Sequence, residues 1–415
     1  MKVLVIEPCY FGLGYLRALK EMSIPCVVAT SETQLPDIHG YRHLVDHIVV
    51  CDVSNVDEIQ LALKAVGQLD SIAAVVSGNQ FVTEASAEFA AKHGLRGLSC
   101  ASASLGVHKD KARRAYQDFG APSLQFALVN SVPQALIEAE RIGYPLIVKP
   151  TSAASSKGVS LVHHAAELQA AFAALSEMNF GVFGLQHRAE FLLEEFADGQ
   201  EFSVELALKD KQLRFAGVTE KWVTAPPYFV ELGHVHPARI SSAQSEALIT
   251  AAHQAAAALE LETGIFHIEL KWGKQGAKII ECNPRPGGDH ITTDLVPLAT
   301  GVNLFKMHLD MLLQKPMVRS SSQTFAAAVG FMVATEVGQL EEIIGWDALM
   351  ALPYVERCVL EKKPGDAIRP PQNSADRIAY IIVTGEDSEQ AASNLQTAMR
   401  MVELRSIPLK AQNES

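Results

Sequence analysis

Short apolar runs alternate with helix-like stretches along the first hundred residues of the chain. The runs are rich in Val and Ile and have the length of buried strands; they occupy 2–6, 26–29, 47–51 and 72–77. This alternation predicts a small parallel α/β unit. Gly12 and Gly14 follow the first run, but Arg17 stands where a dinucleotide-binding fingerprint needs its third glycine. The two glycines therefore predict a tight strand-to-helix turn rather than an NAD site.

The pattern changes near residue 104. A polar helix is predicted over 109–119, and a buried strand ends at Lys149. A Ser/Gly-rich loop, a strand, an Ala-rich helix and a further strand follow over 151–158, 159–162, 165–178 and 191–196. Residues 201–310 carry longer strands, with a hairpin over 201–208 and 213–220, a helix near 242–260 and a second strand pair over 265–272 and 277–283. Beyond a polar linker, 319–323, we expect strands near 325–334 and 377–384 and a helix near 388–402.

Composition limits the classes of partner. The chain has 415 residues, 48% of them hydrophobic and 20% charged, which is typical of a folded protein of two to four domains. Lys and Arg number 35 against 47 Asp and Glu, a net charge of −12, which argues against nucleic-acid and anionic-membrane binding. The six cysteines lack the CxxC spacing of zinc or redox sites, and no apolar run approaches the ~18–20 residues of a membrane span. We expect a soluble, cytoplasmic protein.

The strand pair 265–272 and 277–283 carries the strongest chemical signal. Alternation places His267 and Glu269 on one face of the first strand, and Glu281 and Asn283 on one face of the second. If the turn at 274–276 has three residues, Glu269 lies opposite Glu281 and His267 opposite Asn283. Like charges in such a pair are destabilising unless something neutralises them. Carboxylate and amide oxygens suit Mg²⁺, so the pattern predicts a magnesium site.

Two further groups suggest phosphate chemistry. Arg285 follows Asn283 by two residues, and Gly287 and Gly288 allow the backbone to approach a ligand closely. A metal beside a fixed cation suits phosphoryl transfer. Lys149, at the end of a buried strand, needs an anion, and the loop 152–158 offers backbone N–H groups and hydroxyls without Walker A spacing.

Taken together, these residues resemble the ATP-grasp superfamily, in order, over about 100–310. The resemblance implies an α/β and α+β multidomain protein with the ATP-grasp fold. Its parts would be a pre-ATP-grasp α/β domain (1–103), a small lobe with the phosphate loop (104–200), a large lobe with the metal site (201–318) and a C-terminal α/β extension (319–415).

The resemblance also implies a role for each matching residue. The nucleotide would be held by two lysines, by a glycine-rich loop and by residues that line the adenine and hold the ribose hydroxyls: Lys111 (with Lys109 as the alternative) and Lys149; Ser155, Ser156, Lys157 and Gly158; Glu194, Glu195, Phe196 and Ala197; and Glu201. The magnesium ligands would be Glu269, Glu281 and Asn283, with Mn²⁺ as a possible substitute. Arg285 would steady an acyl phosphate.

Within the superfamily, the segments 218–221, 231–237, 264–269 and 285–290 are similar to L-amino acid ligases. That similarity implies a carboxylate–amine ligase that uses ATP, forms an acyl phosphate and releases ADP and phosphate. Lys149 and Mg²⁺ would neutralise the phosphates, while Arg285 and the backbone of Gly287 and Gly288 would stabilise oxyanion charge. Its partners would be a small-molecule carboxylate and amine, and it would be a homodimer. An ATP-grasp carboxylase and a purine-pathway-type ligase are the alternatives on the same fold.

The substrate contacts are the least determined part of the site. The candidates are Lys221, His234, His236, His267, Asp289 and His290. His234 and His236 have an HxH spacing in a predicted loop, but no further Cys or His stands at zinc-ligand spacing, so substrate contact or a solvated loop is favoured. Asp289 could bind a substrate ammonium group or cap a helix. The sequence identifies neither substrate.

Overall fold

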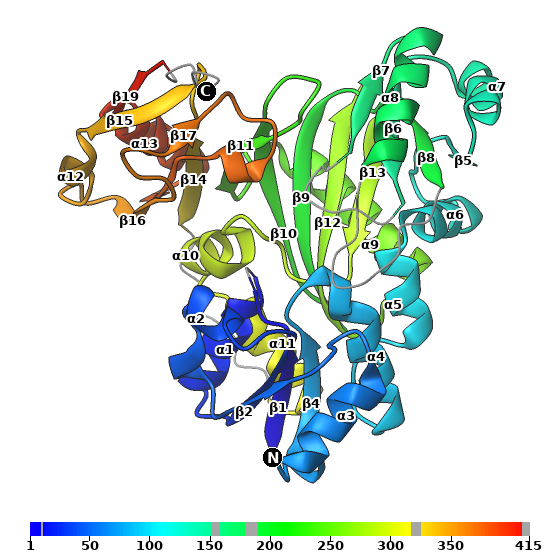
Figure 1. Ribbon diagram of the computed structural model, residues 1–415, viewed down its shortest axis with the longest axis vertical. Coiled ribbons are helices and arrows are strands. Elements are labelled where there is room, and N and C mark those ends of the chain that lie inside the picture. Colours follow the sequence, from blue (N-terminus) through cyan, green and yellow to red (C-terminus); the bar gives the residue numbers. More distant parts are fainter. Residues whose placement is uncertain (10, 152–157, 179–189, 317–324, 409–415) are drawn as a thin grey trace, which may run out of the picture.

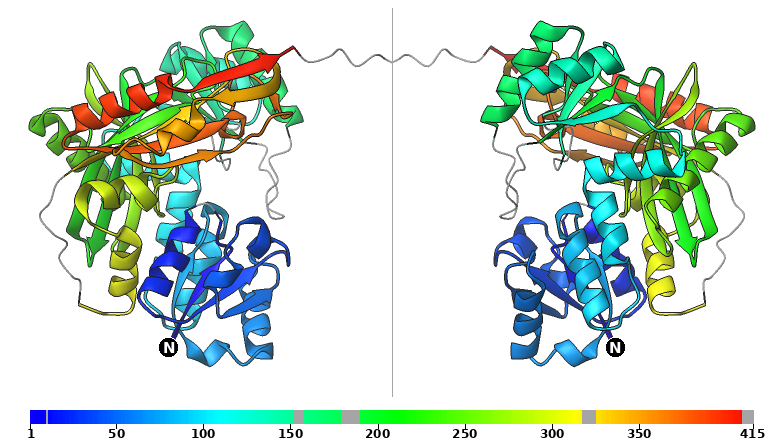
Figure 2. Two further views of the ribbon diagram at one scale, coloured as in Figure 1. Left: turned by 90° about the vertical axis from the view of Figure 1, so that its left-hand side faces the viewer. Right: turned by 90° about the vertical axis from the view of Figure 1, so that its right-hand side faces the viewer.

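The computed structural model describes residues 1–9, 11–151, 158–178, 190–316 and 325–408. Within these residues the strands form four sheets. Figure 1 shows the N-terminal sheet at one end of the molecule and the large central sheet beside a smaller one at the other. Both side views in Figure 2 place the C-terminal strands at the same end as the small sheet. No helix in the described part of the chain is long and apolar enough to cross a membrane.

The N-terminal sheet has the predicted parallel strands. Its order is β3-β2-β1-β4, with β1 (Lys2–Ile6), β2 (Cys26–Thr30), β3 (His47–Val50) and β4 (Ile72–Ser77). The main helices of this part of the chain are α1 (Gly12–Glu21), α3 (Val56–Ala65), α4 (Thr83–Lys92), α5 (Cys100–Val107) and α6 (Lys109–Phe119). The two glycines serve the turn: a Cβ on Gly12 would lie 2.3 Å from the backbone oxygen of Gly78, and one on Gly14 would meet the Phe305 ring.

The small sheet is antiparallel and has the order β5-β8-β6-β7. Its strands are β5 (Phe126–Val129), β6 (Leu146–Pro150), β7 (Ser160–Val162) and β8 (Phe191–Glu195). Helices α7 (Val132–Ile142) and α8 (Ala165–Glu177) pack against it around a core that includes Val148, Phe172 and Leu193. This arrangement places Lys149 and Glu194 on neighbouring strands.

The large sheet has eight strands in the order β13-β12-β9-β10-β11-β14-β18-β16. They are β9 (Gln200–Lys209), β10 (Gln212–Val223), β11 (Glu231–His236), β12 (Gly264–Gly273), β13 (Gly276–Asn283), β14 (Ala326–Met332), β16 (Val355–Leu360) and β18 (Ala379–Gly385). Helix α9 (Ser242–Ala258) covers one face, where its alanines pack against Phe202, Phe266 and Ile279. Helix α11 (Leu304–Leu312) packs between this sheet and α1.

The C-terminal strands β14, β18 and β16 continue the large sheet, because β14 pairs with β11. A three-stranded sheet, β17-β15-β19, lies beyond them and is formed by β15 (Gly338–Ile344), β17 (Ala367–Ile368) and β19 (Glu403–Ile407). Helix α13 (Ser388–Arg400) packs on β14 and β18. The predicted domain boundaries stay predictions. Strands that follow residue 318 nevertheless share the large sheet with strands that precede it.

Candidate active site

The hairpin of β12 and β13 places the carboxylates face to face. Glu269 pairs with Glu281 and His267 with Asn283, so the expected pairing is confirmed. The turn, however, has two residues rather than three, because Gly273 already pairs with Gly276. A bulge next to Glu269 shifts the register by one residue and restores the predicted alignment.

The oxygen atoms on this face fit a hard divalent cation. Glu281 accepts a hydrogen bond from Lys109 (Oε1–Nζ 2.7 Å), and Glu269 accepts one from Lys221 (3.0 Å). Asn283 is 1% exposed, and its side-chain oxygen has no partner within the described residues. A buried, unpartnered amide oxygen beside two carboxylates is a suitable donor set for Mg²⁺. Burial opposes the charge of Glu269, but Lys221 and His267 hold its pKa well below the usual range.

Lys149 lines a cavity together with Glu281, which lies at the edge of the carboxylate face. The cavity is lined by Gly106, Lys109, Ala112, Arg113, Tyr116, Lys149, Glu194, Ile280, Glu281 and Cys282. Lys149 is 7% exposed and pairs with Glu194 (Nζ–Oε2 2.6 Å). Burial lowers the pKa of Lys149. Burial also opposes the charge of Glu194, but Arg113 and Lys149 lower its pKa to about 2. The lining thus contains three cationic and two anionic side chains, an excess suited to a phosphate chain.

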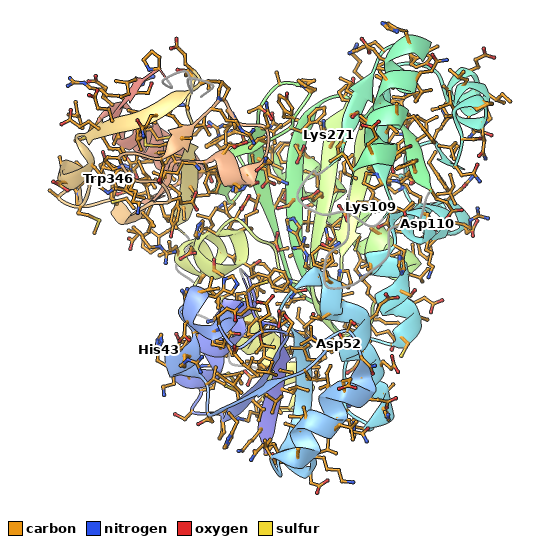
Figure 3. The ribbon with its side chains drawn as sticks, viewed as in Figure 1. His43, Asp52, Lys109, Asp110, Lys271 and Trp346 are labelled. Atoms are coloured by element: carbon orange, nitrogen blue, oxygen red, sulfur yellow. The ribbon has the colours of Figure 1, made fainter. Side chains whose placement is uncertain are left out.

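The two candidate first lysines lie in different places. Lys109 lines this cavity, whereas Lys111 donates to the Ser104 hydroxyl (2.7 Å) and is not part of the lining. In Figure 3, Lys109 lies between α6 and the large sheet, and Asp110 lies on the outer side of the helix. The geometry therefore favours the sequence alternative, Lys109, over Lys111.

The residues predicted to line the adenine lie at the end of β8 and directly after it. Glu194 turns its side chain to Arg113 and Lys149, and Glu195 lies 3.4 Å from Lys278. Lys271 lies over the rings of Phe196 and Phe229, at 5.1 and 5.5 Å from their centroids. Ala197 is buried. Ser155, Ser156 and Lys157 lie outside the described residues; Gly158 follows them with φ of 78°.

Lys221 is at the centre of a buried ion cluster. It is 1% exposed and lies 2.6–3.0 Å from Glu201, Glu231 and Glu269. Burial opposes its charge, yet the three carboxylates raise its pKa well above the usual range. Lys221 therefore connects the predicted ribose ligand, Glu201, to the predicted metal ligand, Glu269.

His267 is held between two carboxylates. Its Nδ1 lies 2.6 Å from Glu205, and its Nε2 lies 3.3 Å from Glu269. Thr292 also donates to Glu205 (3.2 Å). Burial opposes the charge of His267, but Glu205 raises its pKa to about 9. A Cβ on Gly287 would lie 2.8 Å from His267 Nδ1, so glycine is needed for this close approach.

The prediction of a solvated loop for His234 and His236 is wrong. Both lie in β11 and are fully buried, because β11 is an interior strand between β10 and β14. His236 Nδ1 lies 2.9 Å from the Thr219 hydroxyl, while neither ring nitrogen of His234 has a hydrogen-bond partner within the described residues. Burial lowers the pKa of both to about 4.

Asp289 faces this strand rather than capping a helix by a side-chain hydrogen bond. Arg377, from the C-terminal part of the chain, donates to both Asp289 oxygens (3.0 and 2.8 Å) and to the backbone oxygen of Glu231 (3.0 Å). Burial and Asp289 together raise the pKa of Glu231 to about 8. His290 lies 3.0 Å from Asp294 and 4.1 Å from the Tyr380 ring centroid.

Arg285 reaches the N-terminal part of the chain, where it contacts segments that directly follow β1 and β4. Its guanidinium donates to the Gln80 side chain (3.3 Å) and lies 5.2 Å from the Phe11 ring centroid. No heavy atom of the described residues outside its immediate chain neighbours would lie within 4 Å of a Cβ on Gly288, so there is open space beside Gly288.

Sequence reasoning missed Arg113, Glu205, Glu231 and Arg377. Arg113 carried a signal, because it follows Lys109 by four residues and so shares its helix face. Glu205 carried one too, since alternation along β9 places it on the face of Ser203, away from the apolar residues. Glu231 and Arg377 meet only through the pairing of β11, β14 and β18, which no local pattern reveals.

Comparisons with known proteins show which families two parts of the chain resemble. Two family models match: an ATP-grasp domain over residues 142–294 and an L-amino acid ligase C-terminal domain 2 over residues 330–406. An uncharacterized protein of Sinorhizobium fredii is 25% identical over 94% of this chain and 80% of its own length. The alanine–anticapsin ligase of Bacillus amyloliquefaciens is 26% identical over 62% of this chain, and the match spans 57% of that ligase.

The crystal structure of an L-amino acid ligase from Bacillus licheniformis superposes with a TM-score of 0.82. The superposition covers 98% of this chain and 99% of that one at 19% identity, so it shows a shared fold. The predicted fold class is thereby confirmed. The chain thus combines an ATP-grasp domain over residues 142–294 with an L-amino acid ligase C-terminal domain 2 over residues 330–406.

Proposed function

We propose that this protein is an ATP-dependent ligase that joins the carboxylate of an amino acid, or of a similar acid, to the amine of an amino acid. The observation that carries the proposal is one cavity that contains Lys109, Lys149 and Glu281. Phosphate-binding lysines at the edge of a carboxylate and amide face are suited to phosphoryl transfer. The C-terminal domain match over 330–406 favours an amino acid ligase over a carboxylase or a purine-pathway-type ligase.

The reaction has two steps. A substrate carboxylate oxygen attacks the γ-phosphorus of ATP, the bond to the β-phosphate oxygen breaks, and an acyl phosphate and ADP form. The amine nitrogen then attacks the acyl carbon, loses a proton and displaces phosphate. Lys149 and Lys109 bind phosphate oxygens, and Arg285 with the Gly288 backbone stabilises the oxyanion of the second step.

The metal ligands of this proposal are Glu269, Glu281 and Asn283. A bound Mg²⁺ supplies charge neutralisation for the phosphate oxygens. The chain itself contributes the alignment: Lys221 fixes Glu269, and the close approach of Gly287 to His267 fixes the loop that carries Arg285. Assembly into a homodimer stays a prediction.

The test is a matrix of amino acid pairs incubated with ATP and Mg²⁺. ADP and phosphate are measured, and the products are identified by mass spectrometry. We expect ADP formation that depends on both amino acids, together with a product of their summed mass less one water. Bicarbonate-dependent ADP formation without amino acids would overturn the ligase proposal in favour of a carboxylase. AMP as the product would overturn the acyl-phosphate mechanism.

A further inference from the structure

Arg113 is a buried guanidinium between two sheets. It lies on α6, is 2% exposed and is among the largest fully buried side chains of the described chain. A permanent charge is costly to bury unless each donor finds an acceptor. Arg113 meets this need by donating to the small sheet on one side and to the large sheet on the other.

The first contact reaches the phosphate-binding lysine. Arg113 Nε donates to Glu194 on β8, and the other oxygen of Glu194 lies 2.6 Å from Lys149 on β6. One carboxylate is thus shared by two cations, which leaves a net positive charge beside the cavity. Glu194 is 2% exposed, so its two cationic partners determine the orientation of its carboxylate. Arg113 therefore fixes the position in which Glu194 holds Lys149.

The second contact reaches the bulge of the metal-binding strand. Arg113 Nη1 donates to the backbone oxygen of Ile279 (2.7 Å) and Nη2 donates to that of Ile280 (2.6 Å). Ile279 pairs with Leu270, and Ile280 is the unpaired extra residue that brings Glu281 opposite Glu269. An extra residue in a bulge lies outside the ladder, so its carbonyl needs another donor. The planar fork of an arginine supplies donors to two adjacent carbonyls and to a carboxylate at once; a lysine ammonium lacks that geometry.

We propose that Arg113 is a positioning residue that sets Lys149 and Glu281 relative to each other, one through Glu194 and the other through the β13 bulge. This inference rests on the proposed function, because it assigns Lys149 to phosphate and Glu281 to magnesium. Loss of Arg113 therefore weakens nucleotide binding in two separable ways: fewer well-placed cations for the phosphates, and a smaller gain from Mg²⁺.

The experiment measures ADP binding to the full chain by calorimetry, with and without Mg²⁺. The magnesium gain is the dissociation constant without Mg²⁺ divided by that with Mg²⁺. For Arg113→Lys we expect ADP binding weakened about tenfold or more without Mg²⁺, and a smaller magnesium gain than in the wild type. The matched control is Arg114→Lys, the adjacent exposed arginine of α6, which is expected to change neither quantity.

A second variant separates the two contacts. Glu194→Gln removes the charge that links Arg113 to Lys149 but keeps Arg113 for the carbonyls of Ile279 and Ile280. We expect weaker ADP binding without Mg²⁺ and a retained magnesium gain. A lower folded fraction weakens apparent ADP binding by the same factor with and without Mg²⁺, so a merely structural role for Arg113 would leave the magnesium gain unchanged.

The outcomes distinguish this inference from the proposed function. ADP binding and a magnesium gain within twofold of the Arg114→Lys values would overturn the role of Arg113. If Arg113→Lys does not fold, unchanged ADP binding by Glu194→Gln overturns it instead. Wild-type protein that binds ADP with Mg²⁺, shows the expected variant losses and forms no amide would support Arg113 and overturn the ligase proposal. Wild-type protein that binds no nucleotide would overturn both.

Discussion

The buried pair of His267 and Glu205 makes a quantitative prediction about stability. The perturbation is Glu205→Gln, which removes the charge 2.6 Å from His267 Nδ1 and keeps the side-chain size. In the folded protein the pKa of His267 is about 9, against an ordinary value of 6.5. At about 1.4 kcal/mol per pKa unit, the pair contributes about 3 kcal/mol to the free energy of unfolding.

The sign of the pH dependence follows from proton binding. Between pH 6.5 and 9 the folded protein holds the His267 proton while the unfolded chain has lost it. The stabilisation is therefore complete below pH 6.5 and is lost as the pH rises through 9. Without Glu205, burial opposes the charged form of His267. The free energy of unfolding of the variant therefore lacks most of this dependence on pH.

The assay is urea unfolding of nucleotide-free protein at intervals from pH 6 to 10. We expect the free energy of unfolding of the wild type minus that of Glu205→Gln to fall by about 3 kcal/mol across this range. Glu262→Gln, at an exposed surface pair with Lys211, is the control and should give a difference that does not vary with pH. A wild-type minus Glu205→Gln difference that is constant with pH would refute the charged state of His267.

Three further predictions concern the metal face, the phosphate lysine and a buried histidine. Glu281→Gln should lower kcat about 100-fold or more in a coupled ADP assay, because it removes the charge of a proposed metal ligand; near-normal turnover would show that this face does not hold the metal. Lys149→Met should raise the KM for ATP about tenfold or more in the same assay, and an unchanged KM would count against its contact with phosphate. Burial lowers the pKa of His308 to about 4, so the wild type loses stability as the pH falls from 6.5 towards 4. His308→Gln should reduce that loss by about 1.4 kcal/mol per pH unit in urea unfolding, and an identical slope would contradict the assignment.

Local pattern predicted the elements well and the contacts between them poorly. The strands over 2–6 and 72–77 and the helix over 109–119 have the bounds that the sequence indicated, because each is set by alternation or by a turn within its own segment. The facing of Glu269 and Glu281 was also predictable, since it depends on one hairpin. The reason behind that prediction was incomplete: a two-residue turn and a bulge together produce the register that a three-residue turn would have given.

The errors arise where burial depends on distant strands. The segment containing His234 and His236 follows a proline-rich stretch and reads as a loop, yet it becomes interior once β14 pairs along it. The same limit hid the role of the Glu194 side chain, because the sequence indicated only that Glu194 lines the adenine. Its carboxylate is instead fixed by Arg113, 81 residues earlier in the chain.

The C-terminal segment contacts residues of the candidate site directly. Strand β14 completes the hydrogen bonding of β11, which carries Glu231 and His234. Arg377 then binds the backbone of Glu231 and both oxygens of Asp289. Asp289 has a positive φ of 47°, a backbone conformation that needs support from its surroundings. Since Asp289 follows Gly287 and Gly288, the C-terminal segment holds one end of the loop that carries Arg285. The N-terminal part of the chain holds the other end through Gln80, which follows β4. The loop proposed to stabilise the acyl phosphate is therefore supported from both ends of the chain, and a change in either terminal part can reach the reacting centre through it.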